Sequence, residues 1–220
     1  MSKQKGLILC NGQMPPKGLV RRYINEEILF VAADGGANKA LDMGFIPEVI
    51  IGDLDSFDGT KWSHLTNVQI IKDADQETND LEKALAYLLT KSISEVAILG
   101  ATNMRLDHSL KNLSVMLQFN PHFTSLQMID EYGVCSILPK KFVGNYQIGT
   151  TISLVPLSGE VHNIVTTGLK YPLNNETLAV GKRDGSSNEA IQETITIEYG
   201  YGHLLLYVVN IQRPSSDLPQ

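Results

Sequence analysis

Two aspartates stand two residues apart in the segment GDLDS at residues 52–56. Asp53 and Asp55 directly follow the apolar run Glu48–Ile51, and the glycine between lets the chain turn. Two carboxylates this close repel each other unless a cation lies between them. Magnesium prefers a few carboxylate oxygens together with water and phosphate oxygens. The pair therefore predicts a magnesium site, although a solvated acidic turn uses the same residue types.

A second polar cluster is the segment ADGGAN at residues 33–38, which also follows an apolar run and precedes a helical pattern. Gly35 and Gly36 would let backbone amides approach a phosphate group, and the start of a helix favours negative charge. The cluster is a candidate phosphate loop. The alternative is an ordinary turn from strand to helix, with Asp34 as the helix cap.

A third cluster is the acidic segment that precedes the next helical pattern. Asp73, Asp75, Glu77 and Asp80 fall within eight positions. Neighbouring carboxylates disfavour each other's ionisation unless a cation compensates. We single out Asp75 and Asp80 as site residues, while a solvated acidic loop ending in a helix cap would explain most of the segment.

A fourth cluster begins a later helix. Arg105, His108 and Asn112 are spaced to share one helix face, and a guanidinium at the carboxyl edge of a sheet is a natural phosphate clamp. Asp107 would orient Arg105 or accept a proton. The alternative is a surface ion pair between Asp107 and Lys111, four residues apart.

Along the part of the chain that contains the four clusters, apolar runs alternate with helical patterns, and these elements must position the clusters. This rhythm predicts an α/β domain over residues 1–131, with a Rossmann-like parallel sheet and helices on both faces. Ligands bind beyond the carboxyl ends of such strands, so all four clusters would meet at one edge as a magnesium–polyphosphate site. The strand-like runs are Gly6–Cys10, Ile28–Ala33, Glu48–Ile51, Val68–Lys72, Val96–Leu99 and Ser125–Ile129.

Two helices are marked by leucine-rich stripes. The first is capped by Thr78 or Asn79, and the second ends near Pro121. The expected buried face of the first consists of Leu81, Ala84, Leu85, Leu88 and Leu89. The expected stripe of the second consists of Leu106, Leu110, Leu113 and Leu117.

Beyond about residue 132 the pattern changes to short alternating runs separated by Gly, Pro and Asn. This predicts a smaller all-β sandwich domain over residues 132–211 and a loose polar tail over residues 212–220. Strands are expected at Val161–Thr166, Thr177–Val180 and His203–Val209, and around Ile195, Ile197 and Tyr199.

Composition excludes several classes of protein. The formal net charge is -6 and no run of Lys and Arg exists, so we expect no nucleic-acid partner. No apolar stretch is long enough to span a membrane, and none at the start resembles an export signal, so we expect a cytoplasmic protein. Cys10 and Cys135 lie in apolar runs and are expected to be buried, reduced thiols.

As a series, the motifs resemble the thiamine pyrophosphokinase family, and they run through both domains in that family's order. GDLDS and RLDH are moderately specific alone, whereas the whole series is highly specific. The matching segments are ADGGAN (33–38), IIGDLDS (50–56), DQETNDLEKAL (75–85), RLDH (105–108) with Asn112, TTGLKYPL (166–173) and SSN (186–188).

The resemblance implies a homodimer with active sites at the subunit interface. It implies transfer of the pyrophosphoryl group of ATP to the hydroxyethyl oxygen of thiamine, which yields thiamine diphosphate and AMP with Mg²⁺ as cofactor. By motif match, Asp53, Asp55 and Asp80 would hold the metal, and Asp55, Asp80, Arg105 and Asp107 would be catalytic. The residues that would bind the nucleotide are Asp34, Gly35, Gly36, Asn38, Asp75, Arg105 and His108.

The resemblance also implies a thiamine pocket in the second domain. Tyr171, Ser187 and Asn188 match positions there, although core packing is an alternative role for Tyr171. The chain departs from the family's pattern where Asn103 and Met104 replace two glycines. It departs again where Asn79 replaces a threonine, but asparagine still caps a helix.

Two other functions fit parts of the pattern. A glycosyltransferase could use Asp53 and Asp55 to hold a metal–nucleotide-sugar, but this leaves the Asp80 and Arg105 clusters unexplained. A sensor that binds a nucleotide or thiamine without turnover is compatible with the altered glycines at Asn103 and Met104. Release of AMP from ATP and thiamine separates the pyrophosphokinase from both.

Overall fold

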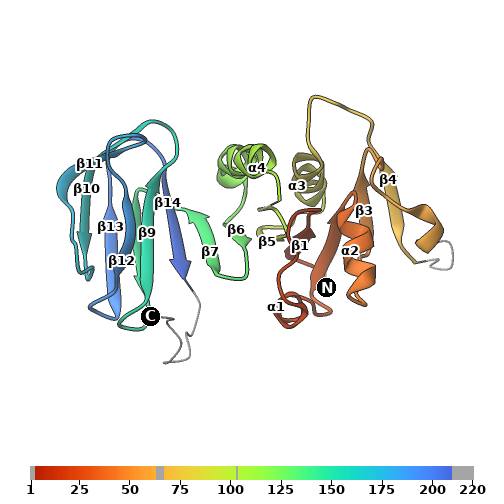
Figure 1. Ribbon diagram of the computed structural model, residues 1–220, viewed down its shortest axis with the longest axis horizontal. Helices are drawn as coiled ribbons and strands as arrows, with labels where there is room; N and C mark the ends of the chain where they lie inside the picture. The colour runs from red at the N-terminus through yellow and green to blue at the C-terminus, as the bar shows by residue number, and fades with distance from the viewer. Residues whose placement is uncertain (1–2, 63–66, 103, 210–220) are drawn as a thin grey trace, which may run out of the picture. The chain divides into compact units, whose positions relative to one another are not determined.

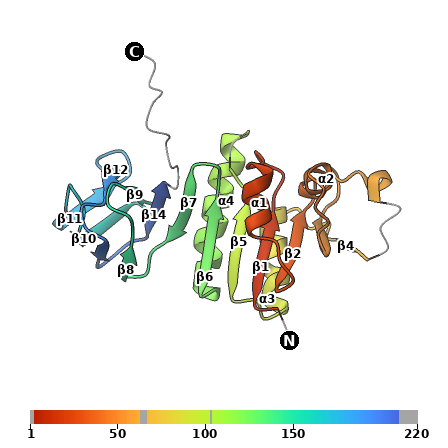
Figure 2. The ribbon, with the colours of Figure 1, turned by 90° about the horizontal axis from the view of Figure 1, so that it is seen from below.

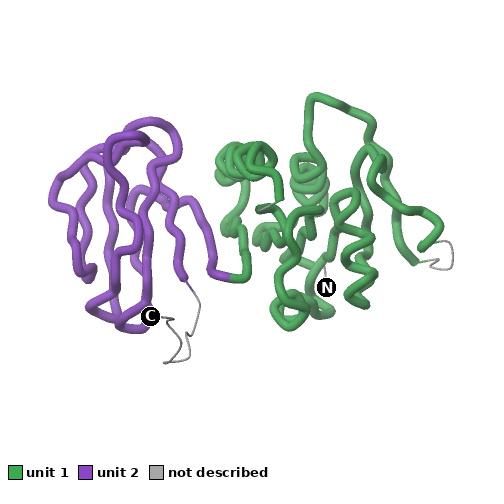
Figure 3. Tube along the Cα trace, in the orientation of Figure 1, with its two compact units in different colours: residues 1–131 green, residues 132–220 purple. Residues whose placement is uncertain are grey.

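The computed structural model describes residues 3–62, 67–102 and 104–209. Within that part of the chain, no helix is long and apolar enough to cross a membrane. The chain divides into two compact units, Met1–Glu131 and Tyr132–Gln220 (Figure 3). Asn103 and the predicted tail at residues 212–220 lie outside the described residues.

Six parallel strands form the sheet of the first unit, in the order β6-β5-β1-β2-β3-β4 (Figures 1 and 2). Strand β1 lies at the centre, and Leu7, Ile8 and Leu9 on it are fully buried. Continuous apolar runs of this kind are typical of strands covered on both faces. The strands are β1 (Lys5–Leu9), β2 (Ile28–Ala33), β3 (Val49–Gly52), β4 (Gln69–Lys72), β5 (Glu95–Leu99) and β6 (Ser125–Ile129).

The strand order reverses beside β1. Strands β2, β3 and β4 follow one another on one side of β1, and β5 and β6 lie on the other. Right-handed crossovers therefore place the first two helices on one face of the sheet and the next two on the other. The helices are α1 (Lys17–Arg22), α2 (Gly36–Asp42), α3 (Asp80–Thr90) and α4 (Leu106–Phe119), with short 3-10 turns η1 (Gly59–Trp62) and η2 (Asn120–His122).

Helix α3 has the predicted cap and the predicted buried face. The Asn79 side chain accepts a hydrogen bond from the Glu82 amide, and the Glu82 carboxylate accepts one from the Asn79 amide. This reciprocal pair satisfies two amides at the helix start. Leu81, Ala84, Leu85 and Leu88 are buried, and Leu89 is partly buried.

Helix α4 packs through a face that only partly overlaps the predicted leucine stripe. Leu106 and Leu110 are 75% and 58% exposed, whereas Val115 and Met116 are fully buried. The inward face includes Asn112, whose side-chain amide donates to the Ala101 carbonyl at 2.7 Å. Of the other two leucines in the predicted apolar stripe, Leu113 and Leu117 are partly buried, so the stripe is covered only in part. Helical periodicity identifies an apolar stripe but does not say whether the sheet or another surface covers it.

The second unit consists of two groups of antiparallel strands, in the orders β12-β9-β14-β7 and β11-β10-β13-β8. Their inward side chains share one core that includes Ile152, Ile164, Ile195 and Leu204. Two sheets packed over one core form a sandwich. The strands are β7 (Gly133–Ile137), β8 (Lys141–Asn145), β9 (Thr151–Pro156), β10 (Glu160–Thr167), β11 (Asn174–Ala179), β12 (Gly185–Glu189), β13 (Thr194–Glu198) and β14 (Leu204–Val209).

Candidate active site

Three carboxylates meet at the carboxyl edge of the parallel sheet. Asp34 follows β2, Asp53 follows β3, and Asp80 begins α3 after β4. Each offers one oxygen, and these oxygens all lie within 4.8 Å of one another. Loops that are far apart in the chain therefore converge on one acidic cluster, because parallel strands bring their carboxyl ends to the same edge.

Gly52 leaves the space that lets the three carboxylates lie close to one another. A Cβ atom at this position would lie 2.8 Å from Asp80 Oδ1 and 2.9 Å from Asp34 Cβ. Both distances are shorter than van der Waals contact, so any side chain at residue 52 would push the cluster apart. The glycine in GDLDS thus serves the site directly as well as the turn.

Electrostatic repulsion is built into this cluster. Asp34 is only 4% exposed, and its Oδ1 atom has no hydrogen-bond partner among the described residues. Burial raises the pKa of Asp34, and the nearby carboxylates of Asp55 and Asp53 raise it further. Burial also raises the pKa of Asp80, with added repulsion from Asp34 and Asp53. A divalent cation fits this donor set, because it would satisfy the orphaned oxygen and remove the repulsion.

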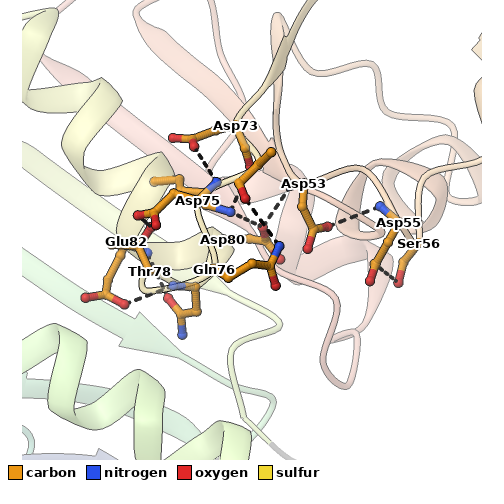
Figure 4. A network of polar contacts seen from close by, with 12 residues as sticks. Asp53, Asp55, Ser56, Asp73, Asp75, Gln76, Thr78, Asp80 and Glu82 are labelled. Atoms are coloured by element: carbon orange, nitrogen blue, oxygen red, sulfur yellow. Dashed lines mark hydrogen bonds and ion pairs between the residues drawn. The ribbon is translucent and has the colours of Figure 1, made fainter.

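The cluster differs from the predicted metal ligands in one member. Asp34 takes the third place, while Asp55 lies outside the group. The exposed Asp55 carboxylate accepts the Ser56 hydroxyl at 3.0 Å, and Figure 4 shows it beside Ser56 on the far side of Asp53 from Asp80. Leu54, between the two aspartates, has a φ of 65° and packs against the apolar cluster that includes Trp62.

Lys83 is a site residue that the sequence reasoning missed. Its side chain is 3% exposed, and its Nζ atom lies 3.8 Å from Asp80 Oδ1. The same ammonium group donates to the Asp73 carbonyl at 2.9 Å. A buried cation thus offsets part of the negative charge of the cluster and ties α3 to the acidic loop. The i, i+3 spacing from Asp80 on α3 was the available signal.

The acidic loop before α3 is stabilised by its own hydrogen bonds (Figure 4). Asp75 accepts from the Glu77 amide at 3.0 Å and from the Thr78 hydroxyl at 2.7 Å. These bonds lower the pKa of the exposed Asp75 carboxyl. The Asp73 carboxylate similarly accepts from the Asp75 amide at 3.1 Å. The solvated-loop interpretation accounts for this geometry, and nucleotide contact by Asp75 stays a prediction.

A pocket of about 260 Å³ adjoins the acidic cluster. It lies beyond the carboxyl ends of β1 and β5, which is the switch point where ligands bind in open parallel sheets. Arg105, His108 and Asn112 all line it, as their shared helix face predicted. Its other lining residues are Cys10, Asn11, Gly12, Ala33, Asn79, Asp80, Leu81, Gly100, Ala101 and Met104.

Arg105 and Asp107 form a bidentate ion pair at the pocket rim. Arg105 Nε donates to Asp107 Oδ1 at 3.1 Å, and Nη2 donates to Oδ2 at 2.5 Å. The guanidinium is the main cause of the lowered pKa of Asp107. Lys111 pairs instead with the buried Glu82 carboxylate at 2.9 Å. The alternative pairing of Asp107 with Lys111 was therefore wrong.

Lys39 connects two walls of the pocket and was also missed. Its Nζ donates to the carbonyls of Asn11 at 2.6 Å and Gly12 at 2.5 Å, and it lies 3.6 Å from Met104 Sδ. The loops after β1 and β5 are thus tied together through α2. Met104 has a left-handed φ of 70°, a backbone conformation that favours glycine.

The predicted phosphate loop makes close contacts with the protein itself. A Cβ atom at Gly35 would lie 2.3 Å from Asn11 Nδ2, and one at Gly36 would lie 2.2 Å from the Leu9 carbonyl. Both glycines therefore let α2 approach the end of β1. Asn38 donates to the Ser56 carbonyl at 2.8 Å and accepts from the Asp58 amide at 3.2 Å. It holds the loop that carries Asp53.

The three predicted thiamine contacts lie together in the second unit. Tyr171 is 65% exposed, so the structure places it outside the core. Ser187 is exposed and has a φ of 56° beside an irregularity in the pairing of β12 with β9. Asn188 is 7% exposed, and its side chain hydrogen-bonds the backbone of Tyr171.

The fold and this geometry define a class of protein, a two-unit α/β enzyme with a cluster of carboxylates beside a pocket at the switch point of a parallel sheet. Comparison with known families narrows the class. Residues 20–129 match the thiamin pyrophosphokinase catalytic domain, and residues 140–204 match the thiamin pyrophosphokinase vitamin B1 binding domain. The chain belongs to the thiamin pyrophosphokinase family.

Individual relatives agree with this assignment. Thiamine pyrophosphokinase of Bacillus subtilis (strain 168) is 29% identical over 202 residues, covering 87% of this chain and 93% of the relative. The crystal structure of the Bacillus subtilis protein has a TM-score of 0.81 at 26% identity, over 93% of this chain and 98% of that one. The structure from Geobacillus thermodenitrificans has a TM-score of 0.82 at 25% identity, over 95% and 99%.

Proposed function

We propose that this chain transfers the pyrophosphoryl group of ATP to the hydroxyethyl oxygen of thiamine, which yields thiamine diphosphate and AMP. Its relatives are thiamine pyrophosphokinases. The single observation that carries the proposal is the cluster of three carboxylates, within 4.8 Å of one another, beside a pocket lined by Arg105. In-line transfer between bound substrates needs positioning and charge stabilisation more than covalent chemistry.

Asp34, Asp53 and Asp80 would hold Mg²⁺, which when bound would neutralise charge on the phosphate oxygens. The orphaned oxygen of Asp34 supports its place in this set. Asp55 stays a predicted ligand, and contact through a metal-bound water suits its position, because magnesium keeps several waters. Lys83 would hold Asp80 in place through their close ion pair.

Arg105 would bind the phosphates from the pocket rim, and His108 and the loop at Asp34–Asn38 would contact the nucleotide. Asp107 would orient Arg105 through the bidentate ion pair. The lowered pKa of Asp107 supports this role over proton acceptance, because a carboxylate with a low pKa is a weak base near neutral pH.

We assign the first unit to nucleotide binding, as a Rossmann-like catalytic domain, and the second to thiamine binding through Tyr171 and Ser187. We further propose a homodimer whose active sites combine the two units across the subunit interface. The exposed leucines of α4, Leu106 and Leu110, support a partner surface on the first unit. A cytoplasmic location stays a prediction from the sequence.

The deciding experiment is incubation with ATP, thiamine and Mg²⁺, followed by identification of the products. Thiamine diphosphate and AMP should form in equal amounts. The variant Asp80→Asn should lose activity by about 100-fold or more, as when a major charge-stabilising group is removed. The exposed, charge-matched control Glu26→Gln should retain full activity.

Each rival function has its own outcome in this experiment. Release of a nucleoside diphosphate from a sugar donor would replace the proposal with a glycosyltransferase. Tight binding of ATP or thiamine with no AMP would replace it with a sensor. The paired aspartates favour the first rival only weakly, because Asp55 does not join Asp53 in the cluster.

A further inference from the structure

The side chain of Asn188 is bound at both ends of its amide by one neighbouring residue. Asn188 Oδ1 accepts from the Tyr171 amide at 3.0 Å, and Asn188 Nδ2 donates to the Tyr171 carbonyl at 2.7 Å. Oδ1 also accepts from the Glu189 amide at 2.9 Å. The side chain is buried, at 7% exposed. The side-chain carbonyl oxygen of Asn188 thus accepts two hydrogen bonds within the protein, and these contacts leave one N–H of the side-chain amide over.

The loop between β10 and β11 is closed at its base without Asn188. The Thr166 amide donates to the Leu173 carbonyl at 2.9 Å, and the Leu173 amide donates to the Thr166 hydroxyl at 2.8 Å. Gly168 supplies a positive φ of 79° at the first bend. Asn188 therefore acts on the middle of the loop, where Tyr171 lies.

The contact also joins the two sheets of the second unit. Asn188 lies on β12 of one sheet, and the Tyr171 loop connects two strands of the other. Residues next to both continue the junction, because the Lys170 amide donates to the Glu189 carbonyl at 2.9 Å. Asn188 thus fixes the backbone of Tyr171 against a different sheet from the one that carries it.

The Tyr171 ring projects from this fixed backbone. It is 65% exposed, with Lys170 Nζ 6.0 Å from the ring centroid. Because the Tyr171 side chain is so exposed, the direction in which it points depends more on its backbone than on packing. An exposed aromatic face suits a flat heterocyclic cation such as thiamine.

We propose that Asn188 is a positioning residue that recognises thiamine only through Tyr171, by holding the backbone from which the ring projects. The proposal rests on the proposed function and changes the role expected of Asn188 from contact to support. Tyr171 and Ser187 remain the residues that face the substrate.

A double-mutant cycle tests this. Asn188→Ala should raise KM for thiamine about tenfold, as expected for the loss of hydrogen bonds worth about that factor, and leave KM for ATP unchanged. Tyr171→Ala should raise KM for thiamine similarly. Because Asn188 acts through Tyr171, the double variant should be no worse than Tyr171→Ala alone. Multiplicative effects would instead mean direct contact by Asn188 and would overturn the proposal.

Two measurements separate positioning from a general loss of structure. Hydrogen exchange should accelerate at the Tyr171 amide in Asn188→Ala, because that amide loses its acceptor, while β13 stays protected. Asn188→Asp puts a carboxylate oxygen in place of the Nδ2 atom that donates to the Tyr171 carbonyl, so the two oxygens repel and KM for thiamine should rise at least as much as in Asn188→Ala. Asn145→Ala removes another side-chain hydrogen bond in the same unit, to Thr194 at 3.0 Å, and should leave KM unchanged.

The outcome also separates this inference from the proposed function. A wild-type chain that forms no thiamine diphosphate refutes the proposed function, while the exchange measurement still tests the Asn188 contact. A wild-type chain that turns over thiamine, with both KM values raised equally in Asn188→Ala or no local change in exchange, refutes the positioning role alone.

Discussion

At the scale of single residues, the acidic cluster is held together against its own repulsion. The Asp53 amide donates to Asp80 Oδ1 at 3.4 Å, and Lys83 lies 3.8 Å from the same oxygen. Neither contact involves Asp34 Oδ1, which has no hydrogen-bond partner among the described residues. Folding therefore leaves an electrostatic cost at a site where a cation would relieve it, which is typical of functional positions.

The pH dependence of the metal-free protein follows from these pKa shifts. Asp34 and Asp80 have raised pKa values in the folded state, so between the ordinary and the raised values the folded chain binds more protons than the unfolded chain. Their contribution to stability is therefore present at low pH and is lost as pH rises through the folded pKa values.

Replacing Asp34 by Asn should remove much of the electrostatic cost of the acidic cluster. In EDTA at neutral pH, Asp34→Asn should melt at a higher temperature than the wild type, and the two should converge as pH falls toward the ordinary carboxyl range. Mg²⁺ should raise the melting temperature of the wild type and not of the variant. Differential scanning calorimetry measures both effects, with Glu26→Gln as the charge-matched control. An equal Mg²⁺ response in Asp34→Asn would remove Asp34 from the ligand set.

At the scale of elements, the start of α3 combines a structural cap with the site. Asn79 caps the helix through the Glu82 amide, and its side-chain Nδ2 donates to Asn112 Oδ1 at 3.0 Å. The next residue is Asp80. The geometry of the cap thus sets the position of a carboxylate in the cluster and links α3 to α4.

Two substitutions at Asn79 distinguish these contributions. Asn79→Ala should lower the free energy of unfolding by about 1–2 kcal/mol, because the cap is lost. Asn79→Thr retains a capping oxygen and loses only the bond to Asn112, so it should cost about 1 kcal/mol or less. Urea denaturation measures both. A threonine variant as unstable as the alanine variant would contradict the capping explanation.

Helix α4 offers a direct test of which face packs. Met116→Ala should lower the free energy of unfolding by about 2–5 kcal/mol, because the side chain is fully buried. Leu110→Ala should change it by less than about 0.5 kcal/mol, because the side chain is 58% exposed. Chemical denaturation at low protein concentration makes the comparison. A cost at Leu110 as large as that at Met116 would mean that the leucine stripe is covered within the chain.

At the scale of the whole molecule, the two units each contain some of the residues to which the proposed function assigns a role. The acidic cluster and the pocket belong to the first, and Tyr171 and Ser187 belong to the second. Each unit also matches its own family domain. Under the proposed function a complete site would combine both units, and the proposed homodimer would do so across the subunit interface.

Mixing two impaired variants, assayed at a thiamine concentration well below the wild-type KM, tests this arrangement. Asp80→Asn disables the first unit and Tyr171→Ala weakens the second. If each site combines units from different subunits, mixed dimers contain one intact site, and an equal mixture should recover about a quarter of wild-type activity. The assay is thiamine diphosphate formation after subunit exchange, with each variant alone as the control. No recovery in confirmed mixed dimers would place both parts of the site in one subunit.

Local patterns in the sequence determined much of this protein. The continuous apolar runs located all six strands of the parallel sheet within a residue or so. The cap at Asn79 and the buried face of α3 followed from residue spacing over a few positions. The motif series identified the family. These features depend on neighbours in the chain, and such neighbours interact in the same way wherever the segment lies.

Only the tertiary structure decided which groups meet. Asp34 joins Asp53 and Asp80 because β2 and β3 are adjacent and Gly52 leaves room, whereas Asp55 lies outside the group. The inward face of α4 and the burial of Asn188 were decided in the same way. Contact between distant segments depends on strand order and packing geometry, and neither is encoded in the spacing of a single motif.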